Sequence, residues 1–305
     1  MTSPELHTRH ETIVEADAPA VYDLITDVVS WPVIFGPTVH TRVLERSPQG
    51  DRFEIRALMP DGVVRAWRSH REFDAARRVT FAQDHDDPAF GRMAGGWTFV
   101  PLPGERTKVV LEHDFTPPSD HDRDAVLARL DHNSTAELAA LRAVAVLPGG
   151  VGRWLLTFTE SLALAGPVSA AREFVWAADR WPERLPHVDG LDLTGLGADT
   201  QSLIMRTRAA DGSVHTTRSL RVLLPGGSIA YKQNQPPRGL LGHCGRWDFP
   251  ADGTSIRSTH TFLVDPAAAG APEAALNRFR AALAANSRTT MEHAARFAAS
   301  IGAVR

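Results

Sequence analysis

Residues 95–99 read Gly-Gly-Trp-Thr-Phe, and 150 positions later residues 245–249 read Gly-Arg-Trp-Asp-Phe. The similarity extends outward from this segment in both directions at nearly the same spacing. The further matches are Trp31-Pro32 with Trp181-Pro182, Asp61-Gly62 with Asp211-Gly212, Arg68-Ser69 with Arg218-Ser219, Arg71 with Arg221, Gln83 with Gln233, His113 with His260, and Asn133-Ser134 with Asn286-Ser287. So many matches in order indicate a duplicated unit of about 150 residues.

A chain of 305 residues is long enough for two domains that each bury a core of their own. The two copies are separated by Leu147-Pro148-Gly149-Gly150, a cluster of residues that interrupts regular structure. We therefore predict an N-terminal domain over residues 1–148 and a C-terminal domain over residues 151–305.

The composition excludes several classes of protein. Hydrophobic residues make up 43% and charged residues 23%, and the net charge of −3 argues against a nucleic-acid partner held by phosphate contacts. No stretch has the roughly 18 uninterrupted apolar residues of a membrane span. The first residues do not resemble a signal peptide, and the single cysteine, Cys244, fits a reducing compartment. We expect a cytoplasmic protein without a membrane partner.

Both copies predict the same order of elements. A first strand near residues 7–16 precedes Asp17, which can cap a helix, and Pro19, which can open it. Segments of strand length follow, separated by turn residues, as in an antiparallel meander. Long helices over residues 120–146 and 272–301 close the two copies. The predicted fold class is α+β, in which each copy is a curved antiparallel sheet around a long C-terminal helix with an internal cavity, a usual ligand site.

The strand predicted over residues 63–73 carries the first candidate site. Alternation of side chains places Trp67, Ser69 and Arg71 on one face, together with Arg65 and Phe73. An arginine is costly to bury among aromatic side chains unless it is paired or lies in a wet pocket. Two interpretations of Arg71 follow, a pocket arginine beside a hydroxyl and a salt-bridged structural arginine.

In the second copy, alternation and repeat disagree. Leu220, Val222 and Leu224 form the more apolar face, so periodicity alone would turn Arg221 and Ser219 outward. The repeat instead predicts that Arg221 points inward, with the three apolar side chains buried against the other domain or another subunit. Solvent exposure of these three side chains would contradict that hypothesis.

Further candidates lie on predicted inner faces of strands and on the long helices. A histidine there is more often a satisfied core residue than a catalyst, and a buried amide needs either a structural partner or a ligand. These candidates are Met93, Trp97, His113 and Asn133 in the first copy and His243, Trp247, His260 and Asn286 in the second.

Several chemical motifs are absent from the sequence. It contains no Gly-rich phosphate loop, His-Glu-x-x-His, paired-cysteine metal site or nucleophile elbow, and we expect no metal and no cofactor. Cys244 has no sequence context of a nucleophile, and a small buried thiol is the favoured interpretation. Two kinds of function therefore remain for this chain, acid–base chemistry in an apolar pocket and ligand binding without chemistry.

Several segments resemble the aromatase/cyclases of bacterial type II polyketide synthases, over nearly all of the first copy and more weakly the second. They are Trp31-Pro32 with Pro37-Thr38-Val39-His40, then residues 65–71 (Arg-Ala-Trp-Arg-Ser-His-Arg), Gly95-Gly96-Trp97 and Leu111-Glu112-His113-Asp114-Phe115. With its two copies, the chain resembles the members of this family that contain two such domains. The resemblance implies the helix-grip fold of the START and Bet v 1 superfamily. It also implies a poly-β-ketone substrate on an acyl carrier protein, supplied by a minimal polyketide synthase and a ketoreductase.

The resemblance further implies aldol closure of the first ring between carbons 7 and 12, followed by dehydration and aromatisation. Arg71 and Ser69 match the pocket arginine and hydroxyl, and Arg221 and Ser219 are their second-copy counterparts. Arg71 would stabilise a developing oxyanion, and water bridged by Ser69 would deliver a proton. The implied substrate-binding residues are Trp67, Trp97, Met93, Trp31, Phe35, His113 and Asn133, with Trp247, His243, His260 and Asn286 in the second copy.

The second copy departs from the pattern. Thr217 stands where the first copy has Trp67, and Leu241 is expected in the place of Met93, so the two pockets are expected to have unequal roles, the first being the better match. For docking of the carrier protein, Arg77, Arg78 and Arg238 are candidates, and solvated surface charges are the alternative. A non-catalytic START-like carrier of an apolar ligand is the rival function.

Overall fold

The computed structural model describes residues 6–75, 77–85, 91–116, 123–208 and 212–303. The chain forms two compact units, with the main division between Val151 and Gly152 and with Pro60–Val63 assigned to the second unit. Each consists of a seven-stranded antiparallel sheet, two short helices after its first strand and a long C-terminal helix. None of the described helices is long and apolar enough to cross a membrane.

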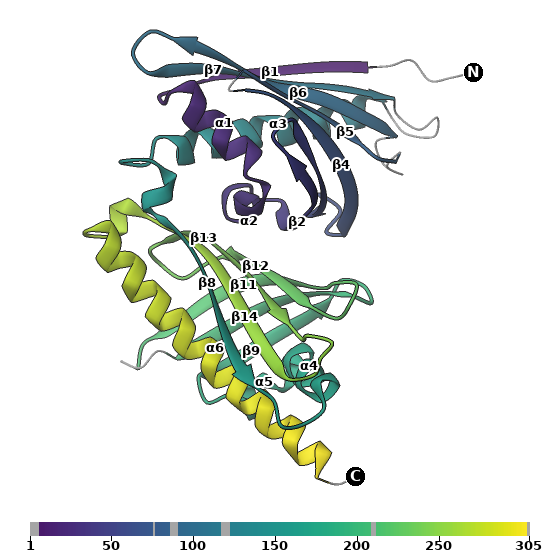
Figure 1. Ribbon diagram of the computed structural model, residues 1–305, viewed down its shortest axis with the longest axis vertical. Helices are drawn as coiled ribbons and strands as arrows, with labels where there is room; N and C mark the ends of the chain where they lie inside the picture. The colour runs from purple at the N-terminus through teal and green to yellow at the C-terminus, as the bar shows by residue number, and fades with distance from the viewer. Residues whose placement is uncertain (1–5, 76, 86–90, 117–122, 209–211, 304–305) are drawn as a thin grey trace. The chain divides into compact units, whose positions relative to one another are not determined.

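The sheet of the first unit is a meander in which the first strand returns to pair with the last. The strand order is β1-β7-β6-β5-β4-β3-β2 (Figure 1). The strands are β1 (Leu6–Val14), β2 (Thr38–Ser47), β3 (Gly50–Leu58), β4 (Val64–Asp74), β5 (Arg78–Gln83), β6 (Arg92–Leu102) and β7 (Arg106–Thr116).

The second unit repeats this topology in the order β8-β14-β13-β12-β11-β10-β9. Its strands are β8 (Leu155–Ala163), β9 (Val188–Gly195), β10 (Thr200–Arg208), β11 (Val214–Leu223), β12 (Ile229–Gln235), β13 (Leu240–Asp248) and β14 (Ser255–Val264). The antiparallel meander predicted from the turn residues is thus confirmed in both copies.

Helices fill corresponding places in the two units. The first has α1 (Ala18–Thr26), α2 (Trp31–Ile34) and α3 (Arg123–Ala145); the second has α4 (Val168–Trp176), α5 (Trp181–Arg184) and α6 (Pro272–Gly302). Single 3₁₀ turns lie at Val28–Ser30, Val151–Arg153, Ala178–Arg180 and Pro266–Ala268. The predicted start of the first long helix, at Asp120, lies outside the described residues, as does Asp211 of the repeat.

The Trp-Pro repeat has a structural cause. Pro32 and Pro182 lie in the first turns of α2 and α5, where a missing N–H costs nothing. The indole N–H of Trp31 donates to Leu24 O at 3.3 Å, and that of Trp181 donates to Phe174 O at the same distance. Each Trp-Pro pair therefore ties a short helix to the helix before it.

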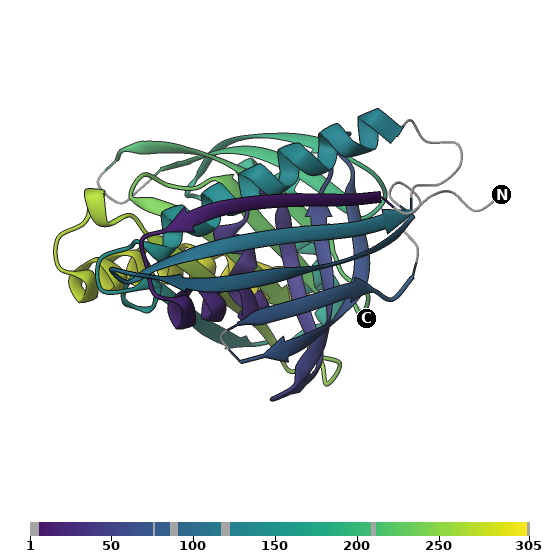
Figure 2. The same ribbon diagram turned by 90° about the horizontal axis from the view of Figure 1, so that it is seen from above.

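The long helices close the inner faces of their own sheets. In Figure 2, α3 runs along β1, and these two elements are in contact. The core of the second unit joins residues of α4 and α6 to strand residues such as Leu203, Ile229, Trp247 and Ile256. This arrangement is the predicted α+β helix-grip architecture. It leaves the residues on the inner face of each sheet to form the site.

Candidate active site

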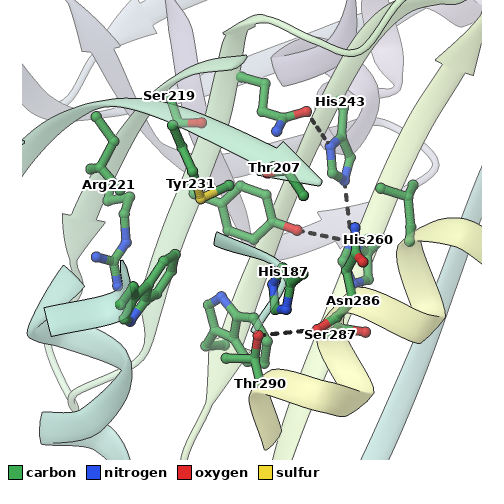
Figure 3. A pocket seen from close by; sticks show the side chains of 16 residues that line it. His187, Thr207, Ser219, Arg221, Tyr231, His243, His260, Asn286, Ser287 and Thr290 are labelled. Atoms are coloured by element: carbon green, nitrogen blue, oxygen red, sulfur yellow. Dashed lines mark hydrogen bonds between the residues drawn. The ribbon is translucent and has the colours of Figure 1, made fainter. Parts of the chain in front are cut away.

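A cavity of about 720 Å³, including its open mouth, lies between the sheet and α6 of the second unit (Figure 3). Strand residues form its inner wall and α6 closes it. The lining residues are Trp181, His187, Leu203, Met205, Thr207, Ser219, Arg221, Tyr231, Gln233, His243, Trp247, His260, Leu283, Asn286, Ser287 and Thr290.

All six residues proposed for the second copy line this cavity: Ser219, Arg221, His243, Trp247, His260 and Asn286. Arg221 faces the cavity, which is the reverse of what the alternation of β11 predicts. The alternation misleads because both faces of the strand are buried: Leu220 and Val222 are 3% and 1% exposed. Leu224 is also buried. None of the three apolar side chains is exposed to solvent, which would have contradicted the prediction from the repeat. Arg221 therefore points inward in the second copy, as the repeat predicts.

The histidines of β13 and β14 form a stacked pair. The ring centroids of His243 and His260 are 5.4 Å apart with an interplanar angle of 11°, and Phe158 stacks on His260 at 4.9 Å. His243 Nε2 lies 3.1 Å from His260 Nδ1, and the Tyr231 hydroxyl lies 2.8 Å from the same nitrogen. These side chains therefore form one connected polar network on the cavity wall.

The network continues to a carboxamide at one end and a hydroxyl at the other. His243 Nδ1 lies 2.6 Å from Gln233 Oε1, and His260 Nε2 lies 3.0 Å from Ser258 Oγ. Burial lowers the pKa of His260 to about 4 and that of His243 well below its usual value of 6.5. Both imidazoles are thus neutral near pH 7.

Arg221 forms the opposite part of the wall. Its Nη1 donates to Gln201 Oε1 at 2.9 Å and to Trp176 O at 3.3 Å, and its Nη2 donates to Val175 O. In the described part of the chain no carboxylate pairs with it. Burial lowers the pKa of Arg221 to about 9, so it keeps its charge at neutral pH. The cavity therefore contains a cation that no carboxylate among the described residues neutralises.

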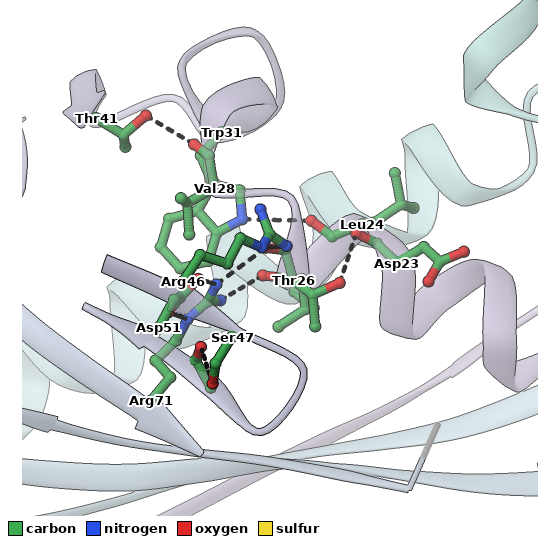
Figure 4. Close-up of polar contacts among 12 residues, drawn as sticks. Asp23, Leu24, Thr26, Val28, Trp31, Thr41, Arg46, Ser47, Asp51 and Arg71 are labelled. Carbon is green, nitrogen blue, oxygen red and sulfur yellow. Dashed lines mark hydrogen bonds and ion pairs between the residues drawn. The ribbon is translucent and has the colours of Figure 1, made fainter. Parts of the chain in front are cut away.

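The corresponding Arg71 has a different environment (Figure 4). Its Nε and Nη2 form a bidentate pair with the Asp51 carboxylate at 2.8 and 2.7 Å, and its Nη1 and Nη2 also donate to Ile25 O and Thr26 O. These are carbonyls at the C-terminal end of α1. The geometry favours the structural interpretation of Arg71, because its removal would leave the buried Asp51 carboxylate without a partner and would destabilise the fold.

The aromatic candidates of the first copy divide into two groups. Trp31 packs edge-on against Phe35 at 5.4 Å, and the Arg71 guanidinium lies 5.4 Å from the Trp31 ring centre, with Trp67 packed against the same cluster. Met93 belongs to another cluster, with Phe115 and Leu130. Trp97 is buried and Ser69, at 5% exposure, lies beside Arg71 on the inner face of β4.

The inner face of the first unit is nonetheless polar. Thr8 Oγ1, Gln83 Oε1, His113 Nδ1 and Ser134 Oγ are buried atoms without a hydrogen-bond partner. They lie on β1, β5, β7 and α3, and Asn133 on α3 is partly buried. One turn beyond Ser134, Glu137 has a pKa raised to about 7 by burial. The first copy thus also encloses polar groups suited to a ligand or water.

Sequence reasoning missed part of the wall of the second cavity. Tyr231 and Gln233 share the inner face of β12, and the match of Gln83 with Gln233 was the available signal. Trp181 could have been predicted as well, because it matches Trp31 in the repeat and Trp31 was a candidate substrate-binding residue. No signal in the sequence identifies four further lining residues, because only the packing of β10 and α6 shows which of their side chains face the cavity. These residues are Leu203, Met205, Ser287 and Thr290.

Some expected placements differ in the structure. Leu241, expected in the place of Met93, is 46% exposed. His243 holds that place, because it pairs with Phe262 across the sheet as Met93 pairs with Phe115. Arg77, Arg78 and Arg238 are exposed. Cys244 is a buried free thiol whose pKa burial raises to about 12, which makes it a poor nucleophile.

A sheet wrapped on a long C-terminal helix with a cavity between them defines the helix-grip class of protein. A family model described as polyketide cyclase/dehydrase and lipid transport matches residues 14–142. Crystal structures of two di-domain aromatase/cyclases, BexL of the BE-7585A pathway and StfQ of the steffimycin pathway, each superpose with a TM-score of 0.79. Their sequences are 36% and 32% identical to this chain, with 96% and 95% of it and 98% of each of theirs covered.

Curated relatives are similar over almost the whole chain. The granaticin polyketide synthase bifunctional cyclase/dehydratase of Streptomyces violaceoruber is 42% identical over 312 residues, covering 97% of this chain and 95% of its own. The actinorhodin counterpart of Streptomyces coelicolor is 39% identical over 314 residues, covering 97% and 98%. The chain belongs to this family of polyketide cyclase/dehydratases and is an aromatase/cyclase enzyme.

Proposed function

We propose that this aromatase/cyclase closes the first ring of a ketoreduced poly-β-ketone between carbons 7 and 12 and then dehydrates and aromatises it. The cavity of the second unit is the proposed site of this chemistry. The substrate would arrive on an acyl carrier protein, after extension by a minimal polyketide synthase and reduction by a ketoreductase. The membership in the cyclase/dehydratase family supports the reaction class.

The unneutralised charge of Arg221 is the observation that carries the proposal. Aldol closure converts one carbon into an enolate and places negative charge on the ketone oxygen that is attacked. A fixed cation in a site shielded from water stabilises such charge far better than it would in solution. Arg71 is less suited, because the Asp51 carboxylate already balances its charge.

The other wall residues support binding and orientation of the chain. Ser219 lies two residues before Arg221 on the same face of β11 and offers a hydroxyl to a ketone or to a bridging water. Trp181, Trp247 and Leu283 are apolar surfaces against which a folded ketide chain can pack. Holding a flexible chain in a reactive shape removes much of the entropic barrier to ring closure.

Reconstitution tests the proposal. The full-length protein is added to a minimal polyketide synthase and a ketoreductase, and the products are identified by liquid chromatography and mass spectrometry. The expected result is conversion of shunt products into one product whose first ring is closed between carbons 7 and 12 and aromatic. An unchanged product pattern, combined with tight binding of apolar ligands, would instead indicate a carrier.

A charge-neutralising variant tests the role of Arg221. Gln201→Glu places a carboxylate where the first copy has Asp51, so the fold can accommodate it, and it should slow ring closure by about tenfold or more because the guanidinium is then balanced. Gln201→Met is the matched control, since it removes the same amide contacts without adding charge, and it should retain most of the rate. Equal rates for both variants would contradict an electrostatic role.

A further inference from the structure

Tyr231 is the wall residue whose chemistry the preceding assignment does not use. Its ring extends from β12 over Gly245 on the neighbouring β13, where any Cβ would collide with the Tyr231 hydroxyl. The first copy has the same crossing, with a Cβ on Gly95 only 2.7 Å from Cζ of Phe81. The repeat thus keeps the ring and its glycine, but only the second copy adds a hydroxyl.

The neighbours of this hydroxyl also differ between the copies. His260 and its counterpart His113 lie on the last strands, and His243 replaces Met93. In the first unit, the buried His113 Nδ1 has no partner. In the second, His260 Nδ1 has two potential partners, the Tyr231 hydroxyl at 2.8 Å and His243 Nε2 at 3.1 Å (Figure 3).

The direction of each hydrogen bond follows from the carboxamide at the end of the network. Gln233 Oε1 is an acceptor, so the proton of the neutral His243 ring is on Nδ1, which donates, and Nε2 carries a lone pair. His260 Nδ1 must then donate to that lone pair. This leaves His260 Nε2 without a proton, and it accepts from the Ser258 hydroxyl.

Because His260 Nδ1 is a donor, it cannot accept the proton of Tyr231. The single Nδ1–H of His260 is then shared between His243 Nε2 and the phenolic oxygen, and the O–H of Tyr231 is free to turn into the cavity, which this residue lines. Burial raises the pKa of Tyr231 well above its usual value of 10, so the hydroxyl stays protonated at neutral pH and can donate.

We propose that Tyr231 is a catalytic residue that donates its proton to the ketide hydroxyl lost in dehydration, with His260 stabilising the phenolate. The Tyr231 O–H and the substrate C–O bonds break, and a bond from that proton to the leaving oxygen forms, so that water departs. The electron pair of the neighbouring C–H bond forms the carbon–carbon double bond, and its proton returns to the phenolate. This inference rests on the proposed function of the same cavity.

The first test is Tyr231→Phe in the full-length protein, which reproduces the ring that the first copy has at Phe81. In the reconstituted synthase, dehydration should fall about 100-fold, as when a proton donor or an oxyanion donor is removed. A ring-closed product that retains its hydroxyl should accumulate. Dehydration within twofold of the parent rate would overturn the role of Tyr231. If the parent itself leaves the shunt pattern unchanged, the proposed function fails together with it.

A second measurement separates proton donation from packing. The chain has two tyrosines, Tyr22 and Tyr231, so Tyr22→Phe leaves Tyr231 as the only site for biosynthetic incorporation of 3-fluorotyrosine. Fluorination makes the phenol more acidic and barely changes its size. The dehydration rate should change at least threefold if the proton moves in the slow step, whereas ring closure should not. A dehydration rate unaffected by fluorine would overturn the proposal even if Tyr231→Phe proved unstable.

Discussion

Arg71 and Arg221 occupy the same place in the two copies and differ in one hydrogen-bonding side chain. Both guanidinium groups reach the carbonyls at the end of a helix, Ile25 and Thr26 in one unit and Val175 and Trp176 in the other. Such contacts satisfy carbonyl groups that a helix end leaves free. What differs is the residue 20 positions before the arginine, Asp51 or Gln201. One side chain thus decides whether the buried charge is neutralised.

Asp51→Asn should strongly destabilise the first unit. The Arg71 and Asp51 side chains are 2% and 0% exposed, and removing one charge of a buried pair leaves the other without compensation. The expected loss is about 3–5 kcal/mol in the free energy of unfolding, measured by urea denaturation. Glu11→Gln, which breaks exposed pairs with Arg9 and Lys108, is the control and should leave the urea midpoint near that of the parent.

The buried histidines predict loss of stability in acid. The pKa of His113 and that of His260 are each lowered by burial from 6.5 to about 4. Above pH 6.5 both are neutral in the folded and unfolded states, and between pH 6.5 and 4 only the unfolded chain binds the protons. The free energy of unfolding should therefore fall over this range, by about 3 kcal/mol per histidine. Urea denaturation of His260→Gln should show a shallower pH dependence than that of the parent protein.

Glu137 predicts the opposite trend. Burial raises its pKa from 4.5 to about 7, so that between these values the unfolded chain releases a proton that the folded protein keeps. The protonated Glu137 side chain therefore favours the folded state fully below pH 4.5, and this stabilisation is lost as the pH rises through 7. Glu137→Gln should stabilise the protein at pH 8 by about 3 kcal/mol and leave it unchanged at pH 4. Glu292→Gln, on the exposed side of α6, is the matched control.

At the scale of elements, the glycines of β6 and β13 allow an aromatic ring to lie flat across the sheet. Gly95 faces Phe81 and Gly245 faces Tyr231 on the adjacent strands. A Cβ at either glycine would also meet a backbone carbonyl, that of Glu112 or that of Thr259. The segment repeated at 95–99 and 245–249 is thus required by the close packing of three strands.

Gly245→Ala should displace the Tyr231 ring and disturb the pairing of β13 with β14. The expected result is a loss of about 2 kcal/mol or more in stability, because backbone atoms cannot move aside as the end of a flexible side chain can. Gly152→Ala is the matched control, since a Cβ there meets no atom within 4 Å, and it should leave the melting temperature within about 1 °C. Equal effects of the two substitutions on thermal denaturation would contradict this account.

At the scale of the molecule, each unit has a core of its own. Residues of α4, α6 and the second sheet make up one large apolar cluster, and Met93, Phe115 and Val126 belong to a cluster of the first unit. Damage to one unit should therefore be local. In the Asp51→Asn protein, amide hydrogen exchange should accelerate in peptides from residues 6–147 and remain near the parent rate in residues 155–302. Equal acceleration in both would show that the units unfold together.

Much of the architecture was predictable because it depends on local and repeated patterns. The meander follows from turn residues between strand-length segments, and Asp17 caps α1 through a 2.8 Å bond to the Ala20 N–H, as its position before Pro19 predicts. The repeat even corrected the alternation pattern of β11, where apolar residues occur on both faces. Period-two patterning cannot distinguish a face that borders a cavity from one that is merely buried.

The sequence by itself determined the duplication, the antiparallel sheets, the long closing helices and the six second-copy residues that line the cavity. Tertiary structure decided what those residues can do. Whether Arg71 is neutralised depends on Asp51 across a strand pair, and whether the Tyr231 proton is free depends on Gln233, His243 and Ser258 together. Charge balance and the direction of hydrogen bonds belong to groups brought together by folding, so no single stretch of sequence contains them.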